Sequence, residues 1–243
     1  MFEFGRDLRK LFEKARESDD LGWLELIGAD LLEAEAKRET TDAGRVSCAR
    51  PFEAWMRASL MWREHARRTG SAASLGRAAS CASDAARHAR TPDQTVAAGL
   101  EAGEIHLARF DLFGGPERLN AARMDIQGLS PEKASTRAWA GALGARLTAR
   151  RADLAETTEE ADRALVLLDT ARRDHRHLPT TVAEELTLDW AGLALRRGVE
   201  RRDVILLDRV GQDLRALVET ASPEYRPVTR AQARVEAFSG LRP

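Results

Sequence analysis

Histidines and paired carboxylates are the residues of this sequence whose types and spacing suggest chemistry, as metal ligands or as acids and bases. His175 and His177 stand two positions apart in a polar link between two expected helices. Histidines at i and i+2 do not share a helix face, and neither an HExxH motif nor a cysteine–histidine set accompanies them. We therefore expect no metal site.

Paired carboxylates lack the surroundings that acid–base catalysis needs. Asp19-Asp20 and Glu159-Glu160 lie in polar stretches, where no apolar enclosure shifts their pKa values. The sequence contains no GxSxG, Walker or GxGxxG motif. We therefore expect no catalytic residue, no cofactor and no enzymatic activity. A pocket that joins His65, His88 or His106 to carboxylates of the adjacent hairpin would support the alternative interpretation that the chain is an enzyme.

Tryptophans and arginines are better candidates, and they indicate binding rather than catalysis. Trp139, Arg146 and Arg150 fall on one expected helix. With Ala145 at the buried position of a helical hairpin, all three point at an open groove. An aromatic ring flanked by guanidinium groups holds acidic or aromatic side chains through stacking and bidentate hydrogen bonds. The alternative is a solvated charged face with a tryptophan in the core.

The other tryptophans are weaker candidates for partner contact. Trp55 and Trp62 are seven residues apart and share a helix face, which either packs against the neighbouring hairpin or lines the groove. We favour the core, although exposed tryptophans would act as binding anchors. The weaker candidates are Trp55, Trp62, His106 and Trp190.

The first residues predict an amphipathic helix over 3–17. Its apolar stripe includes Phe4, Leu8, Leu11 and Phe12, and basic residues surround it. Such a helix docks in a partner's groove or lies on an anionic membrane surface. It equally serves as the cap that the first hairpin of a repeat array needs, and we favour this role.

The composition indicates a chain that builds its own core without disulfides or metals. It has 243 residues, with 38 lysines and arginines against 39 acidic residues, so it lacks the basic excess typical of nucleic-acid binders. No apolar run is long enough to span a membrane. Cys48 and Cys81 have no ligand-spaced partner. These features predict a cytoplasmic protein with free thiols that binds no nucleic acid.

Abundant alanine and scarce β-branched residues predict an all-α fold. Prolines at 51, 92, 131, 179 and 223 mark expected helix starts, at spacings of 41, 39, 48 and 44 residues. Thr91-Pro92-Asp93 shows the pattern of a hydroxyl cap, a proline and an acid, and Gly70 and Gly114 are expected to end helices. The expected helices are 3–17, 20–39, 51–68, 71–89, 92–112, 116–127, 131–150, 153–174, 179–197, 201–220 and 226–239.

The hairpins resemble tetratricopeptide-type repeats of the divergent, longer bacterial kind. The similarity is carried by Ala142-Leu143-Gly144-Ala145, by Asp153-Leu154 at a turn, and by the spaced alanines before Leu165. The resemblance implies one domain over 1–243, an α-solenoid of about five antiparallel helix pairs with a capping helix at each end. The implied pairs are 3–39, 51–89, 92–127, 131–174 and 179–220, with a C-terminal cap at 226–239.

Proteins of this family usually bind peptides or partner domains in the concave groove of their first helices and perform no chemistry. The resemblance therefore implies a non-enzymatic adaptor or scaffold that recognises a protein segment. Two alternatives stay open, an oligomerising structural subunit of a larger assembly and a regulatory domain that partners an enzyme. A carboxylate clamp of the kind some relatives use is not expected, because the one asparagine, Asn120, lies in a second helix.

Overall fold

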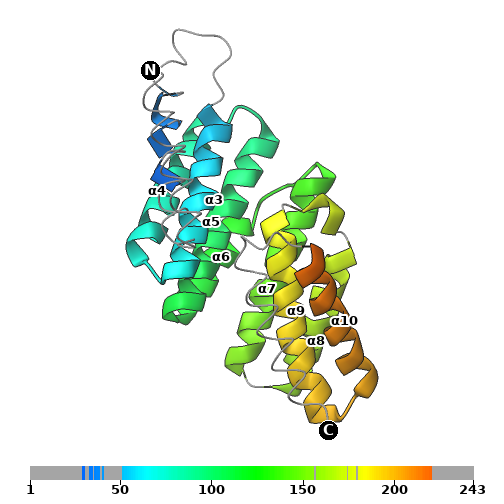
Figure 1. Cartoon of the computed structure of the whole chain (residues 1–243). Coiled ribbons are helices and arrows are strands. Elements are labelled where there is room, and N and C mark those ends of the chain that lie inside the picture. The colour runs from blue at the N-terminus through cyan, green and yellow to red at the C-terminus, as the bar shows by residue number, and fades with distance from the viewer. Residues whose placement is uncertain are drawn as a thin grey trace. The chain divides into compact units, whose positions relative to one another are not determined.

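Helices account for the regular structure in the computed structural model, which describes residues 29–30, 33–34, 36–38, 40, 51–155, 157–173, 175–178 and 180–220. These residues contain no strand, so the expected all-α class is confirmed for them. The elements in chain order (Figure 1) are α3 (Pro51–Thr69), α4 (Ala72–His88), α5 (Pro92–Phe113), α6 (Pro116–Ile126), α7 (Ala134–Ala155), α8 (Thr158–Arg173), η1 (His175–His177), α9 (Thr180–Arg201) and α10 (Val204–Thr220).

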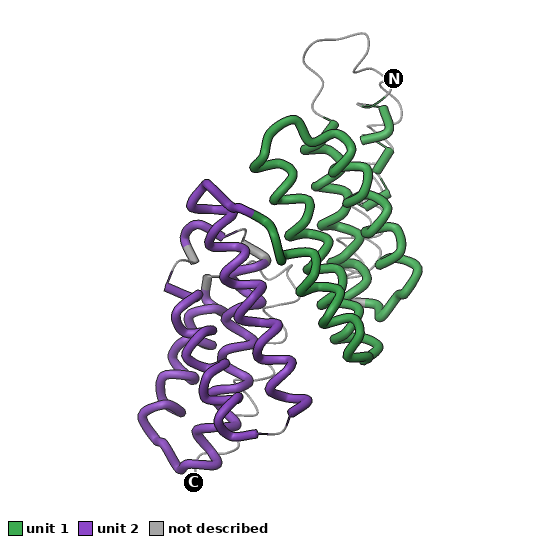
Figure 2. The backbone as a smooth tube through the Cα atoms, turned by 180° about the vertical axis from the view of Figure 1, so that it is seen from behind, with its two compact units in different colours: residues 1–129 green, residues 130–243 purple. Residues whose placement is uncertain are grey.

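The helices group into two compact units, residues 1–129 and 130–243 (Figure 2). In unit 1, α3 packs against α4, α4 against α5, and α5 against α6. In unit 2, α7, α8, α9 and α10 pack in the same succession. The first helices of successive hairpins also meet, α3 with α5 and α7 with α9. Among the helices from α3 to α10, each unit therefore contributes two helical hairpins, and the boundary between the units falls in the link before α7.

Two glycines end helices as the sequence predicts. Gly70 follows α3 and Gly114 follows α5, with φ angles of 71° and 68°, which cost glycine little because it has no Cβ. Their N–H groups donate to the carbonyl oxygens of Ala66 and Phe110, both at 2.8 Å. These bonds satisfy carbonyl groups that have no further partner inside the helix.

The start of α5 also follows its predicted signal. Thr91 Oγ1 accepts a hydrogen bond from the Gln94 N–H at 3.2 Å, and the Gln94 side chain accepts one from the Arg90 N–H at 2.7 Å. Pro92 occupies the first helical position, where a missing N–H costs no hydrogen bond. The hydroxyl cap and the proline together predict the first residue of α5, Pro92, correctly.

Pro131 does not begin a helix, and the predicted start at 131 is wrong. α7 begins at Ala134. The Lys133 carbonyl oxygen accepts from Thr136 Oγ1 at 3.1 Å and from the Arg137 N–H at 3.0 Å, so the helical bonds start there. Proline restricts its own φ to a value that suits an extended link as well as a first helical turn. A proline alone therefore does not locate a helix start.

Two hairpin turns lie later in the chain than predicted. α7 continues to Ala155 rather than ending near 150, because residues 150–155 contain neither glycine nor proline to stop it. α8 then begins at Thr158 instead of 153, and Thr157 Oγ1 accepts from the Glu160 N–H at 3.4 Å. α9 runs to Arg201 instead of 197, and Arg202 follows with a φ of 54°.

The core of each unit consists mainly of alanine and leucine, with a few large side chains between the first helices. Leu75, Leu100 and Leu107 are fully buried in unit 1, as are Leu143 and Leu168 in unit 2. Alanine lets neighbouring helices approach closely. Between successive first helices lie arginines paired with acidic side chains, and these pairs include some of the candidate site residues.

Several predictions lie outside the described residues. They are the helix 3–17 with Phe4, Leu8, Leu11 and Phe12, the first part of 20–39, and the C-terminal helix 226–239. The described residues between 29 and 38 are helical, as expected for 20–39. Within the described part of the chain, no helix combines the length and the apolar character needed to cross a membrane.

Candidate functional site

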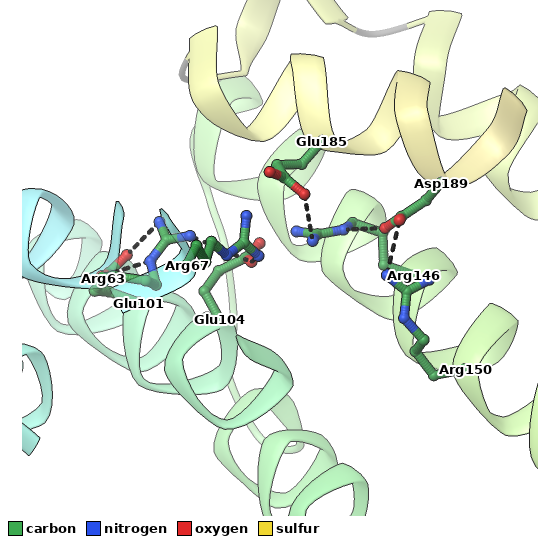
Figure 3. Close-up of polar contacts among 8 residues, drawn as sticks. All are labelled: Arg63, Arg67, Glu101, Glu104, Arg146, Arg150, Glu185 and Asp189. Atoms are coloured by element: carbon green, nitrogen blue, oxygen red, sulfur yellow. Dashed lines mark hydrogen bonds and ion pairs between the residues drawn. The ribbon is translucent and has the colours of Figure 1, made fainter. Parts of the chain in front are cut away.

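A buried cluster of arginines and glutamates joins the first helices of unit 1 (Figure 3). Arg63 on α3 donates from Nε and Nη2 to the two carboxylate oxygens of Glu101 on α5, both at 3.0 Å. Glu104 Oε2 lies 3.8 Å from Arg63 Nη1 and 4.0 Å from Arg67 Nη2. Ser59 Oγ also donates to Glu101 at 3.0 Å. All four charged side chains are buried, so the cluster is part of the core.

The same arrangement recurs in unit 2. Arg146 Nε on α7 donates to Asp189 Oδ2 on α9 at 2.7 Å, and Arg150 Nη2 donates to Asp189 Oδ1 at 2.8 Å (Figure 3). Arg146 Nη2 lies 3.7 Å from Glu185 Oε2. In both units, two arginines one turn apart on a first helix therefore face two acids on the first helix of the next hairpin.

Mutual pairing opposes the loss of charge that burial favours in these clusters, most fully at Arg63 and Asp189, whereas burial still raises the pKa of Glu101. Burial alone lowers the pKa of Arg63, but the carboxylates of Glu101 and Glu104 raise it above its usual value. Burial alone raises the pKa of Asp189, but Arg150 and Arg146 lower it far below its usual range. A buried charge is tolerated only while its partner is present, because desolvating a lone ion is costly. The two clusters therefore act as structural connections between neighbouring hairpins.

Arginines also cover two of the predicted tryptophans. The Arg77 guanidinium lies 3.7 Å from the centroid of the Trp62 ring. Those of Arg172 and Arg209 lie 3.9 and 5.0 Å from the centroid of the Trp190 ring. Cation–π attraction at these distances holds a ring and a cation together. Both tryptophans are only 1% exposed, so these interactions stabilise the interior of each unit.

The structure places most of the predicted partner-binding residues in the interior. Trp55 and Trp139 are 6% exposed and Arg146 is completely buried, whereas Arg150 and His106 are partly exposed. The favoured assignment of Trp55 and Trp62 to the core is confirmed. Arg146 and Arg150 converge on Asp189 and not on an open aromatic surface with Trp139. A role of these residues in partner contact stays a prediction.

Sequence reasoning missed the acids of both clusters. These acids pair with arginines that lie 37 to 43 residues away in the chain, and no local pattern connects the two sides. The signal that could have found them is a repetition. Two arginines four residues apart are followed one hairpin later by two acids three or four residues apart, first as Arg63, Arg67, Glu101 and Glu104, then as Arg146, Arg150, Glu185 and Asp189.

Unit 2 carries a groove of 560 Å³, here called the α7–α8 groove. A Cβ added at Gly141 or Gly144 meets no atom within 4 Å, so the floor of the groove is open to an approaching chain. The groove is lined on α7 by Ala134, Arg137, Ala138, Gly141, Gly144, Ala145 and Thr148, on α8 by Leu167, Thr170 and Ala171, and by His177.

The edge of the α7–α8 groove is basic. Arg137 and His177 are the ionisable residues of its described lining, in which there is no carboxylate. Arg137 Nη2 donates to the Glu132 carbonyl oxygen at 2.9 Å, a neutral acceptor that does not compensate its charge. An apolar floor with a basic edge suits a segment that has an apolar side and an acidic flank.

One buried pair has the composition of a nucleophile and its base. His65 Nδ1 lies 2.8 Å from Ser74 Oγ, which matches the spacing that an activated serine needs. Both residues are buried, and burial lowers the pKa of His65. Neither residue lines the α7–α8 groove. The pair lies in the core of unit 1, where it forms a hydrogen bond between α3 and α4.

Metal ligation has no support in the part of the chain that the structure describes, since no three His, Cys, Asp or Glu side chains there are grouped to hold an ion.

Comparisons with protein-family models, curated proteins and solved structures find no match to this chain. Its function is therefore inferred from its own geometry, in which the α7–α8 groove is a candidate binding surface of unit 2.

Proposed function

We propose that the chain is a cytoplasmic, non-enzymatic protein-binding module, an adaptor or scaffold organised as a tetratricopeptide-like solenoid. The observation that carries the proposal is the α7–α8 groove, with its open floor and basic edge. The succession of helical hairpins in each unit supports the repeat organisation. The full stack of about five pairs with caps belongs to the proposal, because its first pair and its C-terminal cap extend outside the described residues.

The partner that fits the groove is a segment with one apolar side, such as an amphipathic helix. Small residues such as Gly141 and Ala145 let a backbone come close to α7. Leu167 and the neighbouring Val166 are 39% and 65% exposed on α8 and supply apolar area for contact. Arg137 favours acidic residues along the flank of the bound segment.

This proposal places the partner on the α7–α8 surface rather than on the residues Trp139, Arg146 and Arg150. Arg146 is completely buried and hydrogen-bonded to Asp189. A partner that used Arg146 would first have to separate α7 from α9. The α7–α8 groove requires no such rearrangement, because its floor is already open.

Filling the groove tests the proposal. The double variant Gly141→Leu/Gly144→Leu adds two side chains above the floor, and neither added Cβ meets an atom within 4 Å. Gly76→Leu is the matched control, because Gly76 is an exposed glycine of α4 whose added Cβ also meets no atom within 4 Å. Circular dichroism first establishes that all three proteins are equally helical. Each is then used to capture proteins from the native cell extract, which are identified by mass spectrometry.

We expect a partner that the wild type and Gly76→Leu retain and the double variant loses. A partner retained equally by all three contradicts the groove and moves the site to the N-terminal helix with Phe4, Leu8, Leu11 and Phe12. Selective recovery of an enzyme would make the chain a regulatory domain of that enzyme. Recovery of the bait alone would contradict the adaptor function.

Exposed apolar side chains at the turn between α9 and α10 favour a second candidate, an oligomerising subunit. Val199, Val204 and Ile205 are 49%, 66% and 84% exposed, and contact between two copies would remove them from water. Light scattering over a range of protein concentrations separates the candidates. A concentration-independent monomer contradicts self-assembly, whereas an oligomer that Ile205→Glu dissociates supports it.

A further inference from the structure

Unit 1 contains a cavity of 440 Å³, here called the α4–α5 cavity, which the proposed function does not use. Its lining is largely small and apolar, with Ala82 and Ala86 from α4, Ala98 and Ala102 from α5, and Leu129 after α6. Sites for small molecules typically have volumes of about 300–1,000 Å³ and combine an apolar lining with a few polar groups. The α4–α5 cavity has this size and this kind of lining.

The polar end of the cavity is positively charged. His106 and Arg109, one turn apart on α5, are the ionisable residues among the described residues that line it, and this described lining contains no carboxylate. Within the described residues, the Arg109 guanidinium makes no ion pair and no hydrogen bond, although its side chain is partly buried. Arg63 and Arg146, by contrast, are met by carboxylates. A partly buried cation beside an apolar space favours an anionic ligand, because a carboxylate accepts two of its hydrogen bonds.

His106 has an unused hydrogen-bonding atom. Its buried Nδ1 has no hydrogen-bond partner in the described part of the chain, and its Nε2 lies 3.7 Å from Asp125 Oδ2 on α6. Burial lowers the pKa of His106, Asp125 opposes this shift and Arg109 reinforces it. The residues that α4 contributes to the cavity include no titratable group. A carboxylate bound here would favour the protonated ring, because opposite charges attract.

We propose that the α4–α5 cavity binds a small molecule with an apolar body and one terminal carboxylate. The carboxylate lies on Arg109 and close to the His106 ring, and the apolar body lies on the alanines of α4 and α5. The class of ligand is therefore a short- to medium-chain carboxylic acid. This site is independent of the α7–α8 groove, which belongs to the other unit.

Calorimetric titration of the full chain with octanoate tests the proposal directly. Octanol has the same apolar body without the carboxylate, and acetate has the carboxylate without the long apolar body. We expect saturable octanoate binding, with octanol weaker by about tenfold or more, since a hydrogen-bonded charge contributes on that scale. Acetate should also be weaker by about tenfold or more, because it lacks the apolar chain that octanoate buries. Equal affinity for octanol or for acetate, or the absence of octanoate binding, overturns the proposal.

Variants locate the binding site on the chain. Arg109→Gln is expected to weaken octanoate binding by about tenfold or more, and Ala102→Leu to weaken it by filling the cavity. Arg90→Gln, which removes one exposed arginine of the same unit outside the cavity lining, leaves the affinity unchanged. Unchanged binding by Arg109→Gln overturns the site. Equal helicity in circular dichroism shows that each variant remains folded.

Protonation of His106 provides a second readout of binding, measured on protein that circular dichroism shows to be folded. Octanoate should raise the pKa of His106 in an NMR titration, because the bound carboxylate stabilises the charged ring. By linkage, octanoate affinity should then rise as the pH falls from about 8 to about 6. His106→Asn should remove this dependence while Arg109 still binds. A pKa of His106 that octanoate leaves unchanged contradicts the assigned geometry.

Discussion

Arg63 and Glu101 join α3 to α5 through two hydrogen bonds, each 3.0 Å long, inside unit 1. The variant Arg63→Met leaves Glu101 and Glu104 buried without this cation. We expect its free energy of unfolding to fall by roughly 3–5 kcal/mol, the range for breaking a buried ion pair from one side. Urea denaturation followed by circular dichroism measures the change.

A matched surface variant and a double variant distinguish the effect of the buried charge on stability from the effect of packing. Arg87 pairs with Asp84 on the exposed side of α4, and Arg87→Met should change stability by no more than about 1 kcal/mol. Arg63→Met/Glu101→Leu removes both charges of the buried pair and should regain most of the loss. A double variant as unstable as Arg63→Met would show that the charges themselves are not the cause.

Asp189 makes the stability of unit 2 sensitive to acid. Burial alone would raise its pKa, but Arg150 and Arg146 hold the pKa far below its usual range. The contribution of the ionised carboxylate is therefore present above the unfolded pKa of about 3.9 and is lost as the pH falls below it. The stability difference between the wild type and Asp189→Asn should shrink between about pH 4 and pH 2. A difference that stays constant over this range contradicts the assignment.

His65 should make unit 1 less stable in mildly acidic solution. Burial lowers the pKa of His65, and Asp30 opposes this shift only in part. As the pH falls through the unfolded value of about 6.5, the unfolded chain takes up a proton before the folded chain does. The contribution of the neutral ring is therefore present above this pH and is lost below it. His65→Asn, whose side chain can keep a bond to Ser74, should lose less melting temperature between pH 7 and pH 5 than the wild type.

Helix-interior glycines should respond in opposite ways to the same substitution. Gly198→Ala places a Cβ 2.7 Å from Leu207 Cδ2 and 2.9 Å from Leu207 Cγ, so overpacking should destabilise the protein by about 1–3 kcal/mol. Gly144→Ala meets no atom within 4 Å and should stabilise it by up to about 1 kcal/mol through helix propensity. Thermal denaturation measures the melting temperature of each variant relative to the wild type. Equal shifts of the same sign would contradict the close packing of Gly198 against Leu207.

The fold was predictable from the sequence where the chain carries explicit stop and start signals. Thr91-Pro92 and Gly114 delimit α5 within one residue of its observed ends, because a hydroxyl cap and a glycine act locally. The turn between α7 and α8 carries no such signal, and its position depends on how far the helix can continue. The arrangement into two units depends on packing between distant segments, which no local pattern records.

The candidate sites were less predictable than the fold. Arg146 and Arg150 stood out on α7 because guanidinium groups have recognisable chemistry, but their partner Asp189 lies about 40 residues away and looks like an ordinary helix surface charge. Alanines and glycines form about half of the lining of the α7–α8 groove, and the role of such residues appears only when two helices are placed side by side. His106 was a weak candidate, and Arg109 completes its site only because both face the same cavity.

The open space above Gly141 and Gly144 means that helix stability and partner binding favour different residues at these two positions. Larger residues at these positions improve helix propensity, so selection for stability alone would replace both glycines. Selection for a bound partner would keep them, because every added side chain narrows the groove. In a mutational scan scored for protein abundance and for partner capture, substitutions at these two positions should therefore change the two scores in opposite directions. They should raise abundance while they abolish capture.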